Sequence, residues 1–198
     1  MKYLLLALPL FFACDGGMSF IKEVEPTTTD PIIRARELND SAIDLFTKDA
    51  RYGDNALVIF DESIKLDSNY DKPHINKIAV LMQLKRFEAA QKASEALRQL
   101  RPSDADLLVL NGMLFRLEGD SANAVEYFSA ATVMYQNRMA NLDSLAPVYE
   151  AERNKLALVH WIMGNMKEAE HYAPGMTTEE RPTDEMIAAE FWKGLKPE

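Results

Sequence analysis

The sequence predicts an all-α protein built from stacked helix pairs, and three observations lead to this fold class. From position 30 to about position 173, helical segments of about 12 to 18 residues follow one another, and none alternates as a strand does. Short polar breaks separate these segments. Three alanines, Ala56, Ala90 and Ala124, lie 34 residues apart, each just beyond a break. A period of this length is typical of a solenoid of helix pairs.

The chain begins with a segment typical of export. Lys2 precedes an apolar run from Tyr3 to Ala13, and Cys14 follows. Eleven helical residues rise about 16 Å, well short of the roughly 30 Å of a membrane core, so the run predicts a secretory signal and not a membrane span. The alternatives are an ordinary signal peptide cut nearby, or a buried N-terminal helix.

This segment resembles a bacterial lipoprotein signal, in which a small residue precedes a cysteine that is lipidated after cleavage. The resemblance implies that Cys14 is the first mature residue and that a lipid on it anchors the chain to a membrane of the bacterial envelope. We expect the remainder to face the periplasm or the surface. The choice between the inner and the outer membrane stays open.

Residues 14–29 include Gly16, Gly17 and Pro26 without any helical period, and they predict a flexible tether. The helical part begins at Asp30, an N-cap acceptor followed directly by a proline. We therefore expect four parts, which are a signal peptide (1–13), a tether (14–29), a helical repeat domain (30–173) and a C-terminal loop with a capping helix (174–198).

The third helix pair, from Ala105 to about Asn137, carries the clearest motif. Small residues, aromatic residues and a turn recur there at Gly112, Phe115, Gly119, Asp120, Ala124, Phe128 and Ala131. In these positions the chain resembles a tetratricopeptide repeat (TPR) protein. The resemblance covers roughly residues 35 to 173 and implies an α-α superhelix of about four TPR-like pairs. It also makes Gly119 and Asp120 a turn between two helices.

The last two pairs are expected to be elongated. Ala124 and Ala169 lie 45 residues apart, which exceeds the 34-residue period by 11. Eleven residues make about three helical turns, so the insertion lengthens a helix pair without rotating its apolar face. Pro147 fits the first turn of the helix that follows, behind Asp143 or Ser144. We expect the long helices to project beyond the others.

The C-terminal segment predicts one more helix. Thr183 can cap it, and its apolar residues fall on one face at helical spacing, namely Met186, Ile187, Phe191 and Leu195 with Trp192 beside them. Such a helix could cover the open end of the array, as the terminal repeats of solenoids do. Self-association through it is a further possibility.

Composition argues against several classes of function. The formal net charge of -9 disfavours nucleic acid as a partner. A single cysteine excludes an intrachain disulfide and a cysteine-based zinc site. His74, His160 and His171 lack metal-ligand spacing, and Ser103 with Asp106 predicts a helix cap. We predict no catalytic residue, metal or cofactor.

The TPR resemblance implies a concave groove lined by the first helix of each pair. The residues carried over to that groove are Ile75, Ala79, Met82, Val109, Met113, Arg116, Asn154, Leu158 and Trp161. A mostly aliphatic groove with methionines could accept an amphipathic helix or an extended peptide. The same residues could instead form an inner core, filled by the chain's own C-terminal helix. From the sequence, Met113 and Arg116 are expected to face outward.

These observations lead to one main hypothesis and one alternative. The main hypothesis is a membrane-tethered, non-catalytic adaptor of the bacterial envelope that binds a protein or peptide partner. The alternative is a helical-repeat binder of a small molecule or glycan, or a hydrolase, that uses Tyr149, His160 and Trp161. A closed polar pocket with two convergent titratable groups would favour the alternative.

Overall fold

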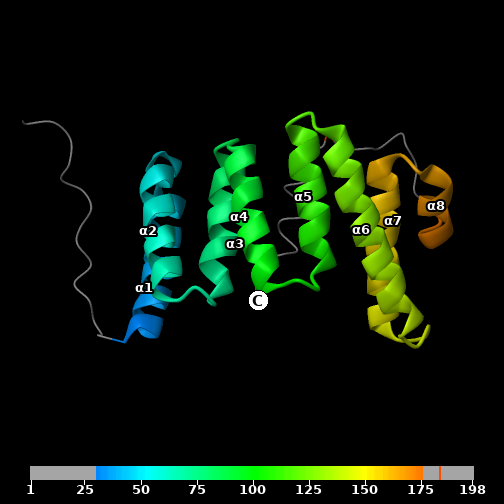
Figure 1. Cartoon of the computed structure of the whole chain (residues 1–198), viewed down its shortest axis with the longest axis horizontal. Helices are drawn as coiled ribbons and strands as arrows, with labels where there is room; N and C mark the ends of the chain where they lie inside the picture. The colour runs from blue at the N-terminus through cyan, green and yellow to red at the C-terminus, as the bar shows by residue number, and fades with distance from the viewer. Residues whose placement is uncertain (1–29, 176–182, 184–198) are drawn as a thin grey trace, which may run out of the picture.

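The computed structural model describes residues 30–175 and residue 183, and these residues form eight α-helices and no strand. The helices stand side by side in a row from α1 to α8 (Figure 1). Their bounds are α1 Pro31–Lys48, α2 Gly53–Leu66, α3 Asp71–Gln83, α4 Phe87–Leu100, α5 Ala105–Leu117, α6 Ser121–Ala140, α7 Pro147–Met163 and α8 Met166–Tyr172. A short 3-10 turn, η1 (Ala50–Tyr52), joins α1 to α2.

The predicted all-α fold of four helix pairs is confirmed. Consecutive helices pack against each other, both within each pair and between pairs. Four predictions lie outside the described residues: the signal peptide, the tether, the lipidated Cys14 and the C-terminal capping helix.

The turns within the second, third and fourth pairs each contain a residue with a positive φ, and these residues recur with the predicted spacing. Lys85, Gly119 and Gly164 have φ values of 57°, 84° and 83°, in the left-handed region. They lie 34 and then 45 residues apart, the same spacings that the alanines show. Asp120 accepts a hydrogen bond from the backbone N–H of Asn123 at 3.1 Å and so caps α6. Gly119 and Asp120 therefore form the predicted turn.

Small residues bring the paired helices close together. Ala56, Ala90 and Ala124 are each at most 1% exposed. A Cβ atom on Gly112 would lie 2.7 Å from the ring of Phe128 and 3.1 Å from the carbonyl oxygen of Ala124. A Cβ atom there would force the ring of Phe128 to shift, so glycine at this position permits the close approach of α5 and α6.

Two helix starts agree with the sequence prediction. Asp30 caps α1, because its Oδ1 accepts the N–H of Ile32 at 2.9 Å, and Pro31 is the first helical residue. Pro147 is the first residue of α7. Proline is favoured there because its missing N–H would have no partner in the first turn.

The start of α5 corrects one prediction. Asp104, and not Ser103, stands at the N-cap, and its Oδ1 accepts the N–H of Asp106 at 3.0 Å. A capping side chain must reach the second or third N–H of the helix, and α5 begins at Ala105. Ser103 lies one residue too early for that role.

The core is divided into two hydrophobic clusters along the array. One is built from α1 to α5 around Phe60, Ile78 and Leu97, and the other from α5 to α8 around Phe128 and Leu156. Half-buried Met82 packs against both. Within the described ranges, no helix combines the length and the apolar character needed to cross a membrane.

Two helices project beyond the array, as predicted from the 11-residue insertion. α6 has 20 residues and α7 has 17, whereas α2 to α5 have 13 or 14, and α1 at the other end of the array has 18. Figure 1 shows the loop that joins α6 to α7 extending below the neighbouring helices. We call this projecting hairpin, residues 134–152, the arm. The elongation of the fourth pair is confined to α7, because α8 has only seven residues.

Candidate partner-binding site

Several residues predicted to line a groove are core residues. Val109 and Met113 on α5 are 0% and 1% exposed, and Trp161 on α7 is 8% exposed. All three belong to the cluster of α5 to α8, whereas Ile75 on α3 belongs to the other cluster and is 1% exposed. The expectation that Met113 faces outward is wrong, because its side chain packs inside that cluster.

The other predicted groove residues are more accessible. Ala79, Met82 and Leu158 are half-buried, and Asn154 is exposed. Arg116 is half-buried, and its Nη1 donates to the carbonyl oxygen of Ile162 at 2.6 Å, which links α5 to α7. For all nine groove residues, contact with a partner stays a prediction.

Ion pairs and hydrogen bonds connect the base of the arm to the start of α5. Arg138 on α6 donates to the backbone carbonyl of Ser103, and its Nη1 lies 3.4 Å from Oε2 of Glu152 on α7. The Nζ of Lys155 on α7 lies 2.8 Å from Oδ2 of Asp106 on α5 and 3.9 Å from Oε1 of Glu152. Both helices of the arm are therefore connected to α5 or to the loop before it.

Tyr135 adds a buried hydrogen bond to this network. Its side chain is 0% exposed, and its hydroxyl donates to Oδ1 of Asp106 at 2.5 Å. Burial and the nearby carboxylate of Asp106 raise the pKa of Tyr135 far above its usual range. The hydroxyl therefore stays protonated and acts as a donor at any physiological pH.

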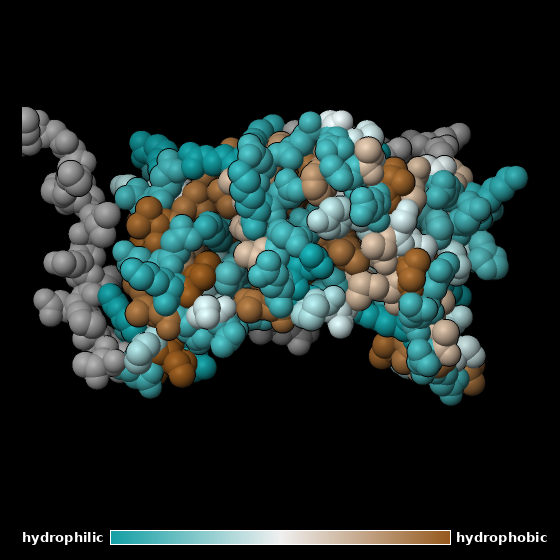
Figure 2. Space-filling model, viewed as in Figure 1, coloured by the Kyte–Doolittle hydropathy of each residue, from teal (hydrophilic) through white to brown (hydrophobic). Residues whose placement is uncertain are grey.

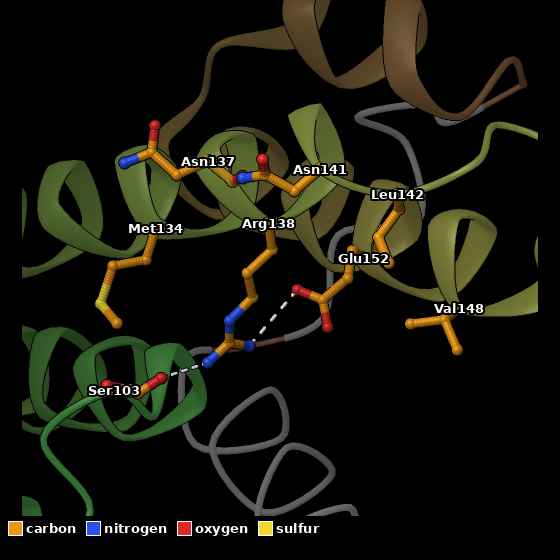
Figure 3. A pocket seen from close by; sticks show the side chains of 8 residues that line it. All are labelled: Ser103, Met134, Asn137, Arg138, Asn141, Leu142, Val148 and Glu152. Carbon is orange, nitrogen blue, oxygen red and sulfur yellow. Dashed lines mark hydrogen bonds and ion pairs between the residues drawn. The ribbon is translucent and has the colours of Figure 1, made fainter.

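A cavity of about 560 Å³ opens beside the network, between the arm and the loop that joins α4 to α5 (Figure 3). Its lining combines three apolar and five polar side chains, which are Met134, Leu142, Val148, Ser103, Asn137, Arg138, Asn141 and Glu152. A second cavity of about 470 Å³ shares Ser103 and Arg138 with the first and is also lined by Arg101, Pro102 and Asp104. We call the two cavities together the cleft.

Hydrophobic side chains are exposed at the end of the arm. Leu145, in the loop between α6 and α7, is 90% exposed, and Val148 on α7 is 57% exposed. Figure 2 shows hydrophobic surface at this end of the molecule, at the lower right. Single exposed apolar residues are common, but these two are three residues apart in the chain on a projecting element, and Val148 lines the cleft.

The residues of the alternative function do not meet in the cleft. His160 stacks on Tyr172 with ring centroids 5.6 Å apart and an interplanar angle of 11°, and burial lowers the pKa of its imidazole. Neither His160 nor Trp161 nor Tyr149 lines either cavity of the cleft. In the described part of the chain, no three His, Cys, Asp or Glu side chains are grouped so as to hold a metal ion.

Comparison with known proteins finds similarity only among solved structures. No protein-family model matches the sequence, and no curated protein matches it. A MamA RS-1 ArsTM double mutant is 19% identical, covering 79% of this chain and 75% of that chain, with a TM-score of 0.48. MamA 41-end from Desulfovibrio magneticus RS-1 is 18% identical, covering 82% and 78%, with a TM-score of 0.47. A crystal structure of MamA is 13% identical, covering 84% and 82%, with a TM-score of 0.48. Similarity at this level says nothing about partners or activity.

The cleft is the part of the site that the sequence did not reveal. Its one signal was the 11-residue insertion, because a hairpin longer than its neighbour leaves space beside the shorter helix. The side-chain network gave no signal, since the bonds that join different helices or loops connect residues 14 to 49 positions apart in the chain. No local motif relates residues at such separations.

Proposed function

We propose that this chain is a membrane-tethered, non-catalytic adaptor of the bacterial envelope, and that it binds a protein partner at the cleft and the end of the arm. One observation carries the proposal. Leu145 and Val148 are exposed on a hairpin that borders an open cavity, and ion pairs between side chains hold the base of this hairpin in place. Exposed apolar side chains next to a pocket are typical of interaction surfaces.

The polar network favours binding because it orders the arm before a partner arrives. Association loses free energy when loops and side chains become ordered at the interface. Bonds from Arg138, Lys155 and Tyr135 hold both helices of the arm against α5 or its preceding loop, so little of this cost remains. The lining of the pocket also suits binding, because its three apolar side chains supply contact area and its five polar side chains can fix the orientation of a ligand.

The proposed location in the bacterial envelope rests on Cys14 and on the segment that follows it. Fifteen residues, 15–29, separate Cys14 from the first described residue, and a flexible chain of that length spans on the order of 20 Å. A lipid on Cys14 would hold the array close to a membrane while leaving it able to reorient. Mass spectrometry of the mature N-terminus tests this part, because an unmodified N-terminus or a cut beyond Cys14 would contradict it.

Two matched substitutions test the binding surface. Val148 on α7 and Val58 on α2 are both helical and both 57% exposed, but only Val148 lines the cleft. We expect Val148→Glu to reduce partner recovery from cross-linked envelopes at least about tenfold, because it places a charge in an apolar contact. Val58→Glu should leave recovery unchanged, and both variants should melt close to the unmodified chain. Identical partner sets from all three proteins would contradict the proposal.

A further inference from the structure

We infer that the partner segment bound in the cleft presents an aromatic side chain and an acidic side chain within two positions of it in the partner's sequence. This inference rests on the proposed function and specifies the chemistry of its partner. It follows from the different linings of the two cavities and from the two residues that they share, Ser103 and Arg138.

The first cavity fits an aromatic ring. Met134 and Arg138 are four residues apart on α6, so they lie on one face of that helix, and Leu142 lies just beyond its end at Ala140. Figure 3 shows Met134 and Arg138 pointing from that helix toward the same space beside Ser103. A thioether and a guanidinium group both interact favourably with aromatic rings, and Leu142 and Val148 add apolar contact.

The second cavity fits a carboxylate. Its lining carries two guanidinium groups, Arg101 and Arg138, and one carboxylate, Asp104. The guanidinium N–H donors that their carboxylate partners leave unused can bind a further carboxylate. Asp104 is already engaged, because its Oδ1 caps α5 and its Oδ2 lies 3.6 Å from Arg101. Arg101 also pairs with Asp71, which does not line the cavity.

Arg138 connects the two parts of the ligand. Among the described residues, its contacts with Ser103 and Glu152 use two of the five N–H donors of a guanidinium group. The face of a guanidinium plane can stack on a ring while its edge donates to a carboxylate. In one partner segment, an aromatic residue could stack on the face of the Arg138 guanidinium group while an acidic residue close to it accepts hydrogen bonds from the edge.

A random peptide display library selected on the immobilised full chain in detergent tests the inference. We expect enriched peptides to carry an aromatic residue with Asp or Glu within two positions. Met134→Ala should weaken binding of a synthetic enriched peptide about 3- to 10-fold, because the sulfur contact is lost. Arg138→Lys keeps the charge but loses the planar group, so it should reduce the preference for aromatic over aliphatic residues.

The control is Val58→Glu, which lies outside the cleft and should bind the peptide like the unmodified chain. Thermal melting of each variant confirms that it is folded, and Met134→Ala provides the test if Arg138→Lys does not fold. Enriched peptides without the aromatic and acidic pair, or binding unchanged by both cleft substitutions, would overturn the inference while leaving the proposed function in place. A selection that enriches no peptide would overturn both.

Discussion

At the residue scale, the left-handed turns show how one repeat differs from the next. Lys85 adopts a φ of 57° at the position where the next two pairs have Gly119 and Gly164. A side chain in this conformation costs about 1–2 kcal/mol. Glycine avoids this cost, but its greater freedom in the unfolded chain offsets part of the gain. The second pair therefore carries strain that its neighbours avoid.

A reciprocal exchange at these turns tests that account. Lys85→Gly should raise the free energy of unfolding by about 0.5–1 kcal/mol, because the strain is relieved. Gly119→Lys should lower it by about 1 kcal/mol, although no heavy atom lies within 4 Å of an added Cβ. Urea unfolding measures both values, and changes of the same sign in the two variants would contradict the account.

His160 should make stability depend on pH. Burial lowers its pKa below the ordinary value of 6.5, so the unfolded chain takes up this proton at a higher pH than the folded chain. The contribution of His160 to stability is complete above pH 6.5 and is lost as the pH falls through 6.5 toward the lower folded pKa. His74 contributes in the same direction, because burial also lowers its pKa.

The substitution His160→Gln removes one of these two contributions. We expect the decrease in unfolding free energy between about pH 7.5 and about pH 5.5 to be smaller in the variant than in the unmodified chain. Urea unfolding at the two pH values measures the decrease. If the variant loses as much stability as the unmodified chain, His160 is not a source of the pH dependence.

At the element scale, the arm depends on its polar base as well as on apolar packing. Asp106 receives both the hydroxyl of Tyr135 from α6 and the ammonium group of Lys155 from α7. Tyr135→Phe should lower the free energy of unfolding by about 0.5–1.5 kcal/mol, because a buried hydrogen bond is lost. A double-mutant cycle with Lys155→Met should give a nonzero coupling energy, since both side chains share one carboxylate. Strict additivity would show that the network does not act as a unit.

Most elements could be predicted from the sequence, because repeat spacing depends on local features. The turn at Gly119, the start of α1 at Asp30 and the projection of α6 and α7 all follow from short motifs or from counting residues. Whether the apolar residues on one face of a helix are buried or line an open groove could not be predicted in the same way. Apolar residues such as Met113 suit both an open groove and a core, and only the packing of α5 to α8 separates the two.

At the scale of the whole molecule, we expect local stability to differ along the array and to be lower in α8 than in α5. α8 has seven residues and a single buried side chain, Ala169, and its last residue, Tyr172, stacks on His160 of α7. α5 has eight buried residues and lies between the two core clusters. In native-state hydrogen exchange, amides of α8 should exchange faster than those of α5, because stability in stacked repeats depends on contacts with neighbours. Equal protection of both helices would contradict this view.

The central claim is that the arm and its cleft contact a protein partner while the chain is in its envelope location. Site-specific photo-crosslinking in living cells tests it most directly, with benzoylphenylalanine placed at Leu145 on the arm or at Leu66 on α2. Both residues are exposed, at 90% and 42%, and only Leu145 belongs to the arm. The proposal predicts a discrete protein adduct from Leu145 and none from Leu66. No adduct at Leu145, or the same adducts at both positions, would contradict it.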